Sequence, residues 1–116
     1  MVALVEVGYH IGSHADTFWY VDTGAGLVGL GRWADAHKIR SRCVRTCRGT
    51  HPVYRYLIPD DKLPLKLVGV RHTSRGNTRR KVFNIEKPGI YRLNYLLEKE
   101  EWRESEVVEI WLEEER

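Results

Sequence analysis

The chain has 116 residues, 42% of them hydrophobic, with a formal net charge of +3 at pH 7. A chain of this length buries enough apolar surface to fold alone, so we expect a single domain over residues 1–116. The apolar content, with four Trp and six Tyr, excludes a disordered chain, and no run reaches the roughly 18 apolar residues of a membrane span. Residues 1–11 lack the basic start of a signal peptide, so we expect an intracellular, cytoplasmic protein.

The composition also resembles that of thermophile proteins. The chain has no Gln, one Met and three Asn, whereas Glu and Arg are abundant. Thermophile proteins avoid thermolabile residues and use many ion-pairing ones. They are also the intracellular proteins in which disulfides are common, which bears on the two cysteines.

The first third of the chain predicts two strands and a Gly-rich bend. Residues 2–7 form a β-branched run and residues 17–23 an aromatic and β-branched run, with turn-forming residues 8–15 between them. We expect these two strands to form a hairpin. Residues 24–31 alternate Gly with apolar side chains, which favours a tight bend or bulge, and residues 32–37 favour one helical turn.

The middle of the chain predicts further short strands. They cover residues 38–47, 53–58, 65–72, 79–85 and 90–97. Residues 73–78 read as a hairpin loop, since Gly76 and Asn77 tolerate positive φ angles. For residues 96–115 the sequence favours a strand, while a helix capped by Ser105 stays open.

Seven or eight short strands with turn signals about every ten residues predict an all-β domain, an antiparallel sandwich or open barrel, with a C-terminal helix as the open point. Residues 88–95 (PGIYRLNY) resemble the entry into a late strand of immunoglobulin-like domains. The resemblance implies that a Tyr hydroxyl ties back to the preceding turn. It favours the sandwich and implies no function.

The motif Asp22-Thr23-Gly24-Ala25, preceded by three apolar residues, resembles the active-site turn of retropepsin-like aspartic proteases. That family uses two carboxylates that share a proton, so the resemblance implies a homodimer in which each chain supplies Asp22. The residues after Leu67-Val68-Gly69 depart from the second motif of the family. The alternative is that Asp22 and Gly24 serve turn geometry, and we lean against an enzyme.

Cys43 and Cys47 leave three alternatives open: free thiols, a disulfide, or part of a metal site. Residues i and i+4 of a regular strand lie about 13 Å apart, which is too far for one disulfide or one metal ion. Both of these alternatives therefore require a bend at residues 44–46. Zinc loops need four ligands, and His37 and His51 are the nearest imidazoles. We therefore expect no metal site and no cofactor, with the disulfide as a possible pairing.

Charge is strongly segregated along the chain. Residues 32–81 hold fourteen basic and three acidic side chains, a net +11, whereas residues 82–116 hold five basic and ten acidic ones. Nucleic acids are bound chiefly through phosphates, by several Lys or Arg side chains on one face. We expect a binding module that contacts the nucleic-acid backbone through Arg40, Arg42, Arg55, Arg71, Arg75, Arg79 and Arg80.

Two further interpretations remain open for these cations. Tyr54 and Tyr56 flank Arg55 and would add base stacking if they lay on the same surface. Alternatively, the ten acids of residues 82–116 pair with the basic face, within the domain or across a dimer, as in thermophile ion networks. An acidic protein surface or self-association would then replace nucleic acid as the partner.

Overall fold

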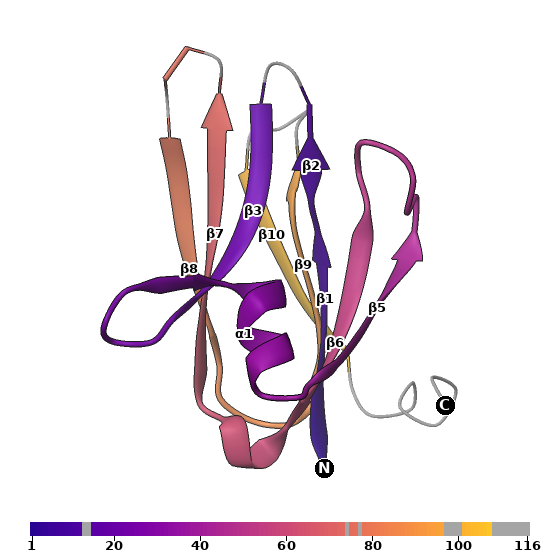
Figure 1. The fold of residues 1–116 in the computed structure, drawn as a ribbon, viewed down its shortest axis with the longest axis vertical. Helices are drawn as coiled ribbons and strands as arrows, with labels where there is room; N and C mark the ends of the chain where they lie inside the picture. Colours follow the sequence, from indigo (N-terminus) through magenta and orange to yellow (C-terminus); the bar gives the residue numbers. More distant parts are fainter. Residues whose placement is uncertain (13–14, 74, 77, 97–100, 108–116) are drawn as a thin grey trace.

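The structure is a computed structural model that describes residues 1–12, 15–73, 75–76, 78–96 and 101–107 (Figure 1). In chain order its elements are β1 (Val2–Gly8), β2 (His10–Ile11), β3 (Ala15–Asp22), β4 (Leu27–Gly29), α1 (Leu30–Ala36), β5 (Arg40–Arg45), β6 (Val53–Pro59), the 3-10 turn η1 (Asp60–Lys62), β7 (Leu65–Thr73), β8 (Thr78–Ile85), β9 (Gly89–Leu96) and β10 (Glu101–Val107). The predicted all-β fold is confirmed, and the helical turn predicted at residues 32–37 is α1.

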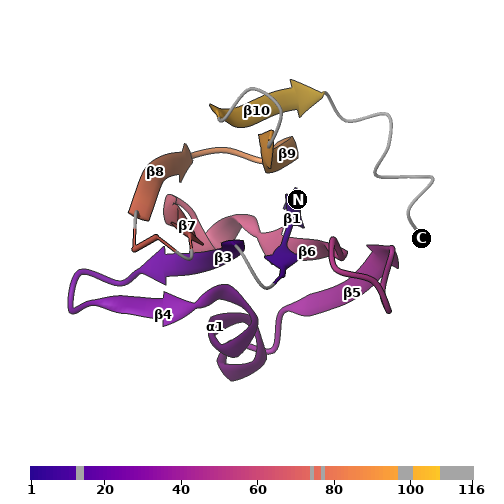
Figure 2. The ribbon, with the colours of Figure 1, turned by 90° about the horizontal axis from the view of Figure 1, so that it is seen from above.

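The strands form two packed sheets. Sheet A has the order β10-β9-β1-β6-β5, and sheet B has the order β2-β3-β7-β8 with β4 paired to β3. Seen from above, β8, β7 and β3 lie on one side and β9, β1, β6 and β5 on the other, while α1 lies between β4 and β5 (Figure 2). The purely antiparallel prediction is wrong at one place, because β1 pairs with β9 in parallel.

The predicted hairpin between residues 2–7 and 17–23 is also wrong. β1 pairs with β6 and β9 in sheet A, whereas β3 pairs with β4 and β7 in sheet B. The short β2 also pairs with β3, and it forms the hairpin with that strand, with His10 opposite Thr17. The chain therefore crosses from one sheet to the other between β1 and β2, which lets the two apolar runs face each other across the core.

The core lies between the sheets and follows the strand alternation. In β3, every second residue from Ala15 to Val21 is buried, and Trp19 is 1% exposed. Its indole ring lies 5.4 Å from Phe83 and 5.5 Å from Trp102 between ring centroids. Trp102 fits there because Gly69, opposite Trp19 on β7, has no side chain. Leu30, Trp33 and Ala34 bury one side of α1 in the same core.

The immunoglobulin-like turn and the last strand can be compared with their predictions. The Tyr91 hydroxyl donates a hydrogen bond to the Lys87 carbonyl oxygen at 2.7 Å, so the predicted tie-back is confirmed.

Residues 101–107 form β10, as the strand interpretation predicts, and residues 108–115 lie outside the described residues. None of the described helices is long and apolar enough to cross a membrane.

Candidate nucleic-acid interface

The centre of the candidate site is Glu6, in the middle of β1. Ala3, Val5 and Val7 point into the core, so alternation places Glu6 on the opposite face of sheet A. The register then sets Arg55 of β6 beside Glu6 on one side and Arg92 of β9 beside it on the other. Glu6 is only 5% exposed, and a carboxylate this buried requires partners.

Three arginines surround this carboxylate. Arg55 Nε donates to Glu6 Oε1 at 2.9 Å, and Arg45 Nη2 donates to Oε2 at 3.1 Å. Arg92 Nε lies 3.8 Å from Oε2. The arginine side chains are 21%, 66% and 36% exposed, respectively. We call these four residues the Glu6 cluster, which holds one negative and three positive charges.

Arg45 belongs to the Glu6 cluster because β5 is irregular at its end. In the regular part of the β5–β6 pair, Arg42 lies opposite Arg55 and Cys43 opposite Tyr54. The register then shifts, and Arg45 rather than Val44 lies opposite Val53. A bulge of this kind re-aims a side chain. It brings Arg45 to the face that carries Arg55 and Glu6.

The same face continues onto the edge strand β5. Arg42 lies across from Arg55, and Arg40 follows two residues earlier on the same side of the strand. Both residues are exposed. We call this surface the basic face of sheet A and define it by Arg40, Arg42, Arg45, Arg55 and Arg92. A hollow beside Glu6, lined among others by Gly8, Arg45, Arg92 and Asn94, opens onto it.

The structure therefore divides the seven predicted arginines into two groups. Arg40, Arg42 and Arg55 lie together on sheet A, whereas Arg71, Arg75, Arg79 and Arg80 lie on or beside the β7–β8 hairpin of sheet B. Figure 1 shows β8 and β5 on opposite sides of the molecule. Along β8, Arg79 pairs with Arg71 and Arg80 with Val70, so the two neighbouring arginines point to opposite faces of that sheet.

Sequence reasoning missed Arg45, Arg92 and Glu6 as members of the site. Arg92 was overlooked because it stands between two apolar residues, Tyr91 and Leu93. Those two side chains point into the core, whereas Arg92 points away from it. Alternation along that strand was the available signal for Arg92. The irregular period at Val44 and Arg45 was the signal for the bulge.

The tyrosines that flank Arg55 face the other way. Tyr56 is 3% exposed, and its hydroxyl oxygen lies 3.1 Å from that of Tyr9. Burial raises the pKa of both Tyr9 and Tyr56 above the ordinary value. Tyr54 packs against Tyr9 with ring centroids 5.6 Å apart. The predicted stacking role is therefore wrong for Tyr56, which is buried, and Tyr54, which is partly buried, lies on the same core side of β6.

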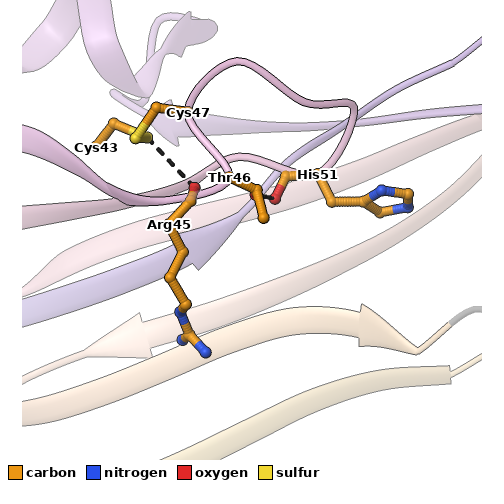
Figure 3. The surroundings of a disulfide bond; sticks show 5 residues. All are labelled: Cys43, Arg45, Thr46, Cys47 and His51. Carbon is orange, nitrogen blue, oxygen red and sulfur yellow. Dashed lines mark hydrogen bonds between the residues drawn. A yellow bond between two sulfur atoms is a disulfide. The ribbon is translucent and has the colours of Figure 1, made fainter.

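Cys43 and Cys47 form a disulfide with a Cα–Cα distance of 5.8 Å (Figure 3). The bulge and the positive φ of 46° at Thr46 supply the bend that a regular strand lacks. The loop is pinned further by the Thr46 hydroxyl, which donates to the His51 carbonyl oxygen. Closing so short a loop stabilises the fold by only about 2 kcal/mol in the chain-entropy treatment. The cross-link thus acts mainly on local geometry.

Asp22 ends β3 and shapes the turn into β4. Its Oδ1 accepts a hydrogen bond from the Gly24 amide at 2.9 Å, and the Thr23 amide donates to the Gly26 carbonyl oxygen at 3.0 Å. Gly24 has a φ of 88°, which glycine adopts without strain. These contacts agree with the turn interpretation. The protease interpretation stays a prediction, because it depends on a second chain.

A histidine pair lies at the end of the domain where β2 meets the β5–β6 loop. The rings of His10 and His51 stack with centroids 4.4 Å apart. Burial lowers the pKa of His10 below 6.5, and His51 and Arg71 lower it further. Within the described part of the chain, no three His, Cys, Asp or Glu side chains gather as metal ligands.

Comparison with known proteins leaves the site to be interpreted on its own geometry. No family model, curated protein or solved structure matches this chain.

Proposed function

We propose that this protein binds nucleic acid through the phosphate backbone, using the basic face of sheet A. The observation that carries the proposal is the composition of four adjacent strands. β5, β6, β1 and β9 place five arginines on one face, and Glu6 is the only acidic residue in their sequences. Counted over these four strands alone, the five arginines and Glu6 sum to a formal charge of +4.

The dimensions of this face suit a stretch of backbone. Arg42, Arg55 and Arg92 follow one another across β5, β6, β1 and β9, with Glu6 between the last two. Strands in a sheet are about 4.8 Å apart, so this row spans about 14 Å. A guanidinium presents a planar fork of N–H donors that binds two phosphate oxygens at once. The row therefore supports contact with several phosphates of one strand or groove.

The position of the tyrosines supports backbone contact over base recognition. Single-strand binders add aromatic rings on which bases stack, and here Tyr54 and Tyr56 lie on the core side of β6. Duplex DNA carries more charge per unit length than a single strand. We therefore expect binding without sequence preference, and tighter binding to a duplex than to a single strand of equal length.

A salt titration of fluorescence anisotropy with a labelled duplex tests this proposal. For each phosphate contacted, the slope of log K against log salt is about −0.9. Substituting Arg40→Ala and Arg42→Ala together removes two contacts and should reduce the magnitude of the slope by about 1.8.

The matched control is Arg79→Ala with Arg80→Ala, which removes the same charge from exposed positions of β8. It should change the slope by less than half as much. Equal losses in the two variants would move the site away from sheet A, and no salt-dependent binding in the wild type would refute the proposal.

An acidic protein surface is the alternative ligand for the same arginines. The acids of residues 98–100 and 108–116 lie outside the described residues, so pairing of the basic face with them stays a prediction. Light scattering separates the two cases. A monomer that binds duplex supports nucleic acid, and a salt-sensitive oligomer that ignores duplex supports self-association.

A further inference from the structure

The position of Arg45 depends on a bulge that a cross-link encloses. The register shift lies between Cys43 and Arg45, and the disulfide joins Cys43 to Cys47. Arg45 is thus inside the five-residue loop that the disulfide closes. The Cys43 Sγ lies 3.4 Å from the Arg45 carbonyl oxygen, while the Arg45 side chain points away from both sulfur atoms (Figure 3).

Without the cross-link, a regular alternative is open to this segment. Continuing the pairing of Arg42 with Arg55 and Cys43 with Tyr54 would set Val44 opposite Val53. Successive residues of a strand point to opposite faces, so Arg45 would then leave the face of Glu6. The disulfide restrains the backbone in the bulged register, in which Arg45 donates to Glu6 at 3.1 Å.

The disulfide is also placed where a thiol reagent reaches it. Cys47 is exposed, and β5 is the edge strand of sheet A. Arg42 and Arg48, both exposed, are each next to a cysteine along the chain. Cations near a cysteine stabilise the thiolate, which is both the leaving group and the nucleophile of disulfide exchange.

We propose that Cys43–Cys47 is a reversible thiol–disulfide exchange site for dithiol reductants, and that its oxidised state holds Arg45 on Glu6. One thiolate of the dithiol attacks the Cys47 sulfur, forms a mixed disulfide and releases the Cys43 thiolate. The second thiolate of the dithiol then attacks its own sulfur in the mixed disulfide and releases the Cys47 thiolate. The dithiol leaves as a cyclic disulfide after giving up two electrons, and the two cysteine thiolates take protons from solvent.

The coupling between the bond and the ion pair is reciprocal. If the disulfide favours the Arg45–Glu6 contact, then that contact favours the disulfide by the same factor. Removing the contact should therefore make the bond easier to reduce. This consequence does not involve nucleic acid.

The experiment equilibrates the full chain with graded ratios of reduced to oxidised dithiothreitol and measures the free thiols by alkylation and mass spectrometry. Arg45→Ala should shift the equilibrium toward the dithiol by about twofold, the size expected for a charged hydrogen bond whose arginine is 66% exposed. Arg48→Ala is the matched control, since it removes an exposed cation next to Cys47, and it should not shift the equilibrium toward the dithiol. Equal shifts in the two variants, or a disulfide that resists excess dithiothreitol in the folded protein, would overturn the proposal.

A second measurement rests on the proposed function and can fail separately from it. Reduction of the wild type should lower the salt slope of duplex binding by about 0.9, one phosphate contact, and should leave the slope of Arg45→Ala unchanged. If neither redox state binds duplex, the proposed function fails, while the thiol equilibrium still decides the exchange site. Binding that is identical in both redox states of the wild type would overturn the control of Arg45 by the disulfide.

Discussion

Replacing Glu6 by Gln should lower stability and strengthen polyanion binding at the same time. The substitution keeps the shape of the side chain but removes the charge that Arg45, Arg55 and Arg92 share. The three guanidinium groups would then repel one another without the Glu6 charge between them, at a position that is only 5% exposed. The same change leaves the basic face with one more positive charge to offer a phosphate.

The stability loss can be estimated pair by pair. Arg55, 21% exposed and 2.9 Å from Glu6, is the most buried of the three partners, and losing its charged hydrogen bond costs about 1–2 kcal/mol. Arg45 is 66% exposed and Arg92 lies 3.8 Å away, so solvent screening limits each of these to a few tenths of a kcal/mol. The sum of about 2 kcal/mol corresponds to a fall in Tm of about 6–8 °C for a domain of this size.

Urea unfolding followed by tryptophan fluorescence measures the loss, and anisotropy at fixed salt measures the gain in duplex affinity, which we expect to be about three- to fivefold. Asp60→Asn is the control, because its ion pair with the Met1 amino group is long, at 3.9 Å, and both groups are more than half exposed. It should change stability by less than about 0.5 kcal/mol. A Glu6→Gln variant as stable as the wild type would refute the Glu6 cluster as a structural feature. Weaker duplex binding by a folded variant would refute the role of this face.

Two further outcomes test the core and the histidine pair. Gly69→Ala should cost about 1–3 kcal/mol in urea unfolding, because the added Cβ would lie 2.5 Å and 2.7 Å from ring atoms of Trp102; a loss below 0.5 kcal/mol would contradict this packing. Stability should also fall as the pH drops below 6.5, because the lowered pKa of His10 means that the folded state binds fewer protons than the unfolded one. Unfolding curves at pH 7.5 and 5.5 measure this loss, and His10→Phe, which keeps a ring against His51, should reduce it. An unchanged pH dependence in that variant would contradict the assignment.

Local pattern predicted the strands well where they are rich in β-branched and aromatic residues or alternate in burial. Trp19 and Val21 on β3, and Phe83 and Ile85 on β8, are buried at every second position, as the sequence indicates. Pairing between strands was harder to predict. The two apolar runs before residue 24 look like a hairpin locally, but the partners of β1 come from β6 and β9, about fifty and ninety residues away.

Strand periodicity did not predict the distance between the two cysteines, because one residue of the strand is irregular. Regular strand geometry places Cys43 and Cys47 about 13 Å apart, whereas the observed Cα–Cα distance is 5.8 Å. The difference comes from the bulge between Cys43 and Arg45 and from the left-handed backbone at Thr46. Neither a valine at position 44 nor a threonine at position 46 requires such a backbone conformation. The same bulge brings Arg45 to Glu6. The pairing of the cysteines and the membership of Arg45 in the site therefore depend on the same bulge, of which the sequence shows only the break in period at Val44 and Arg45.

Glu6 explains why Arg45, Arg55 and Arg92, which are far apart in the chain, gather at one point of sheet A. A carboxylate inside an apolar strand must find cations, and those that it finds are 39, 49 and 86 residues away in sequence. Neutralising Glu6 would need one arginine, and the structure supplies three, on a face that adds Arg40 and Arg42. Self-repulsion among these guanidinium groups costs stability, which Glu6 offsets in part. Under the proposed function, a phosphate backbone would supply further negative charge to the same arginines.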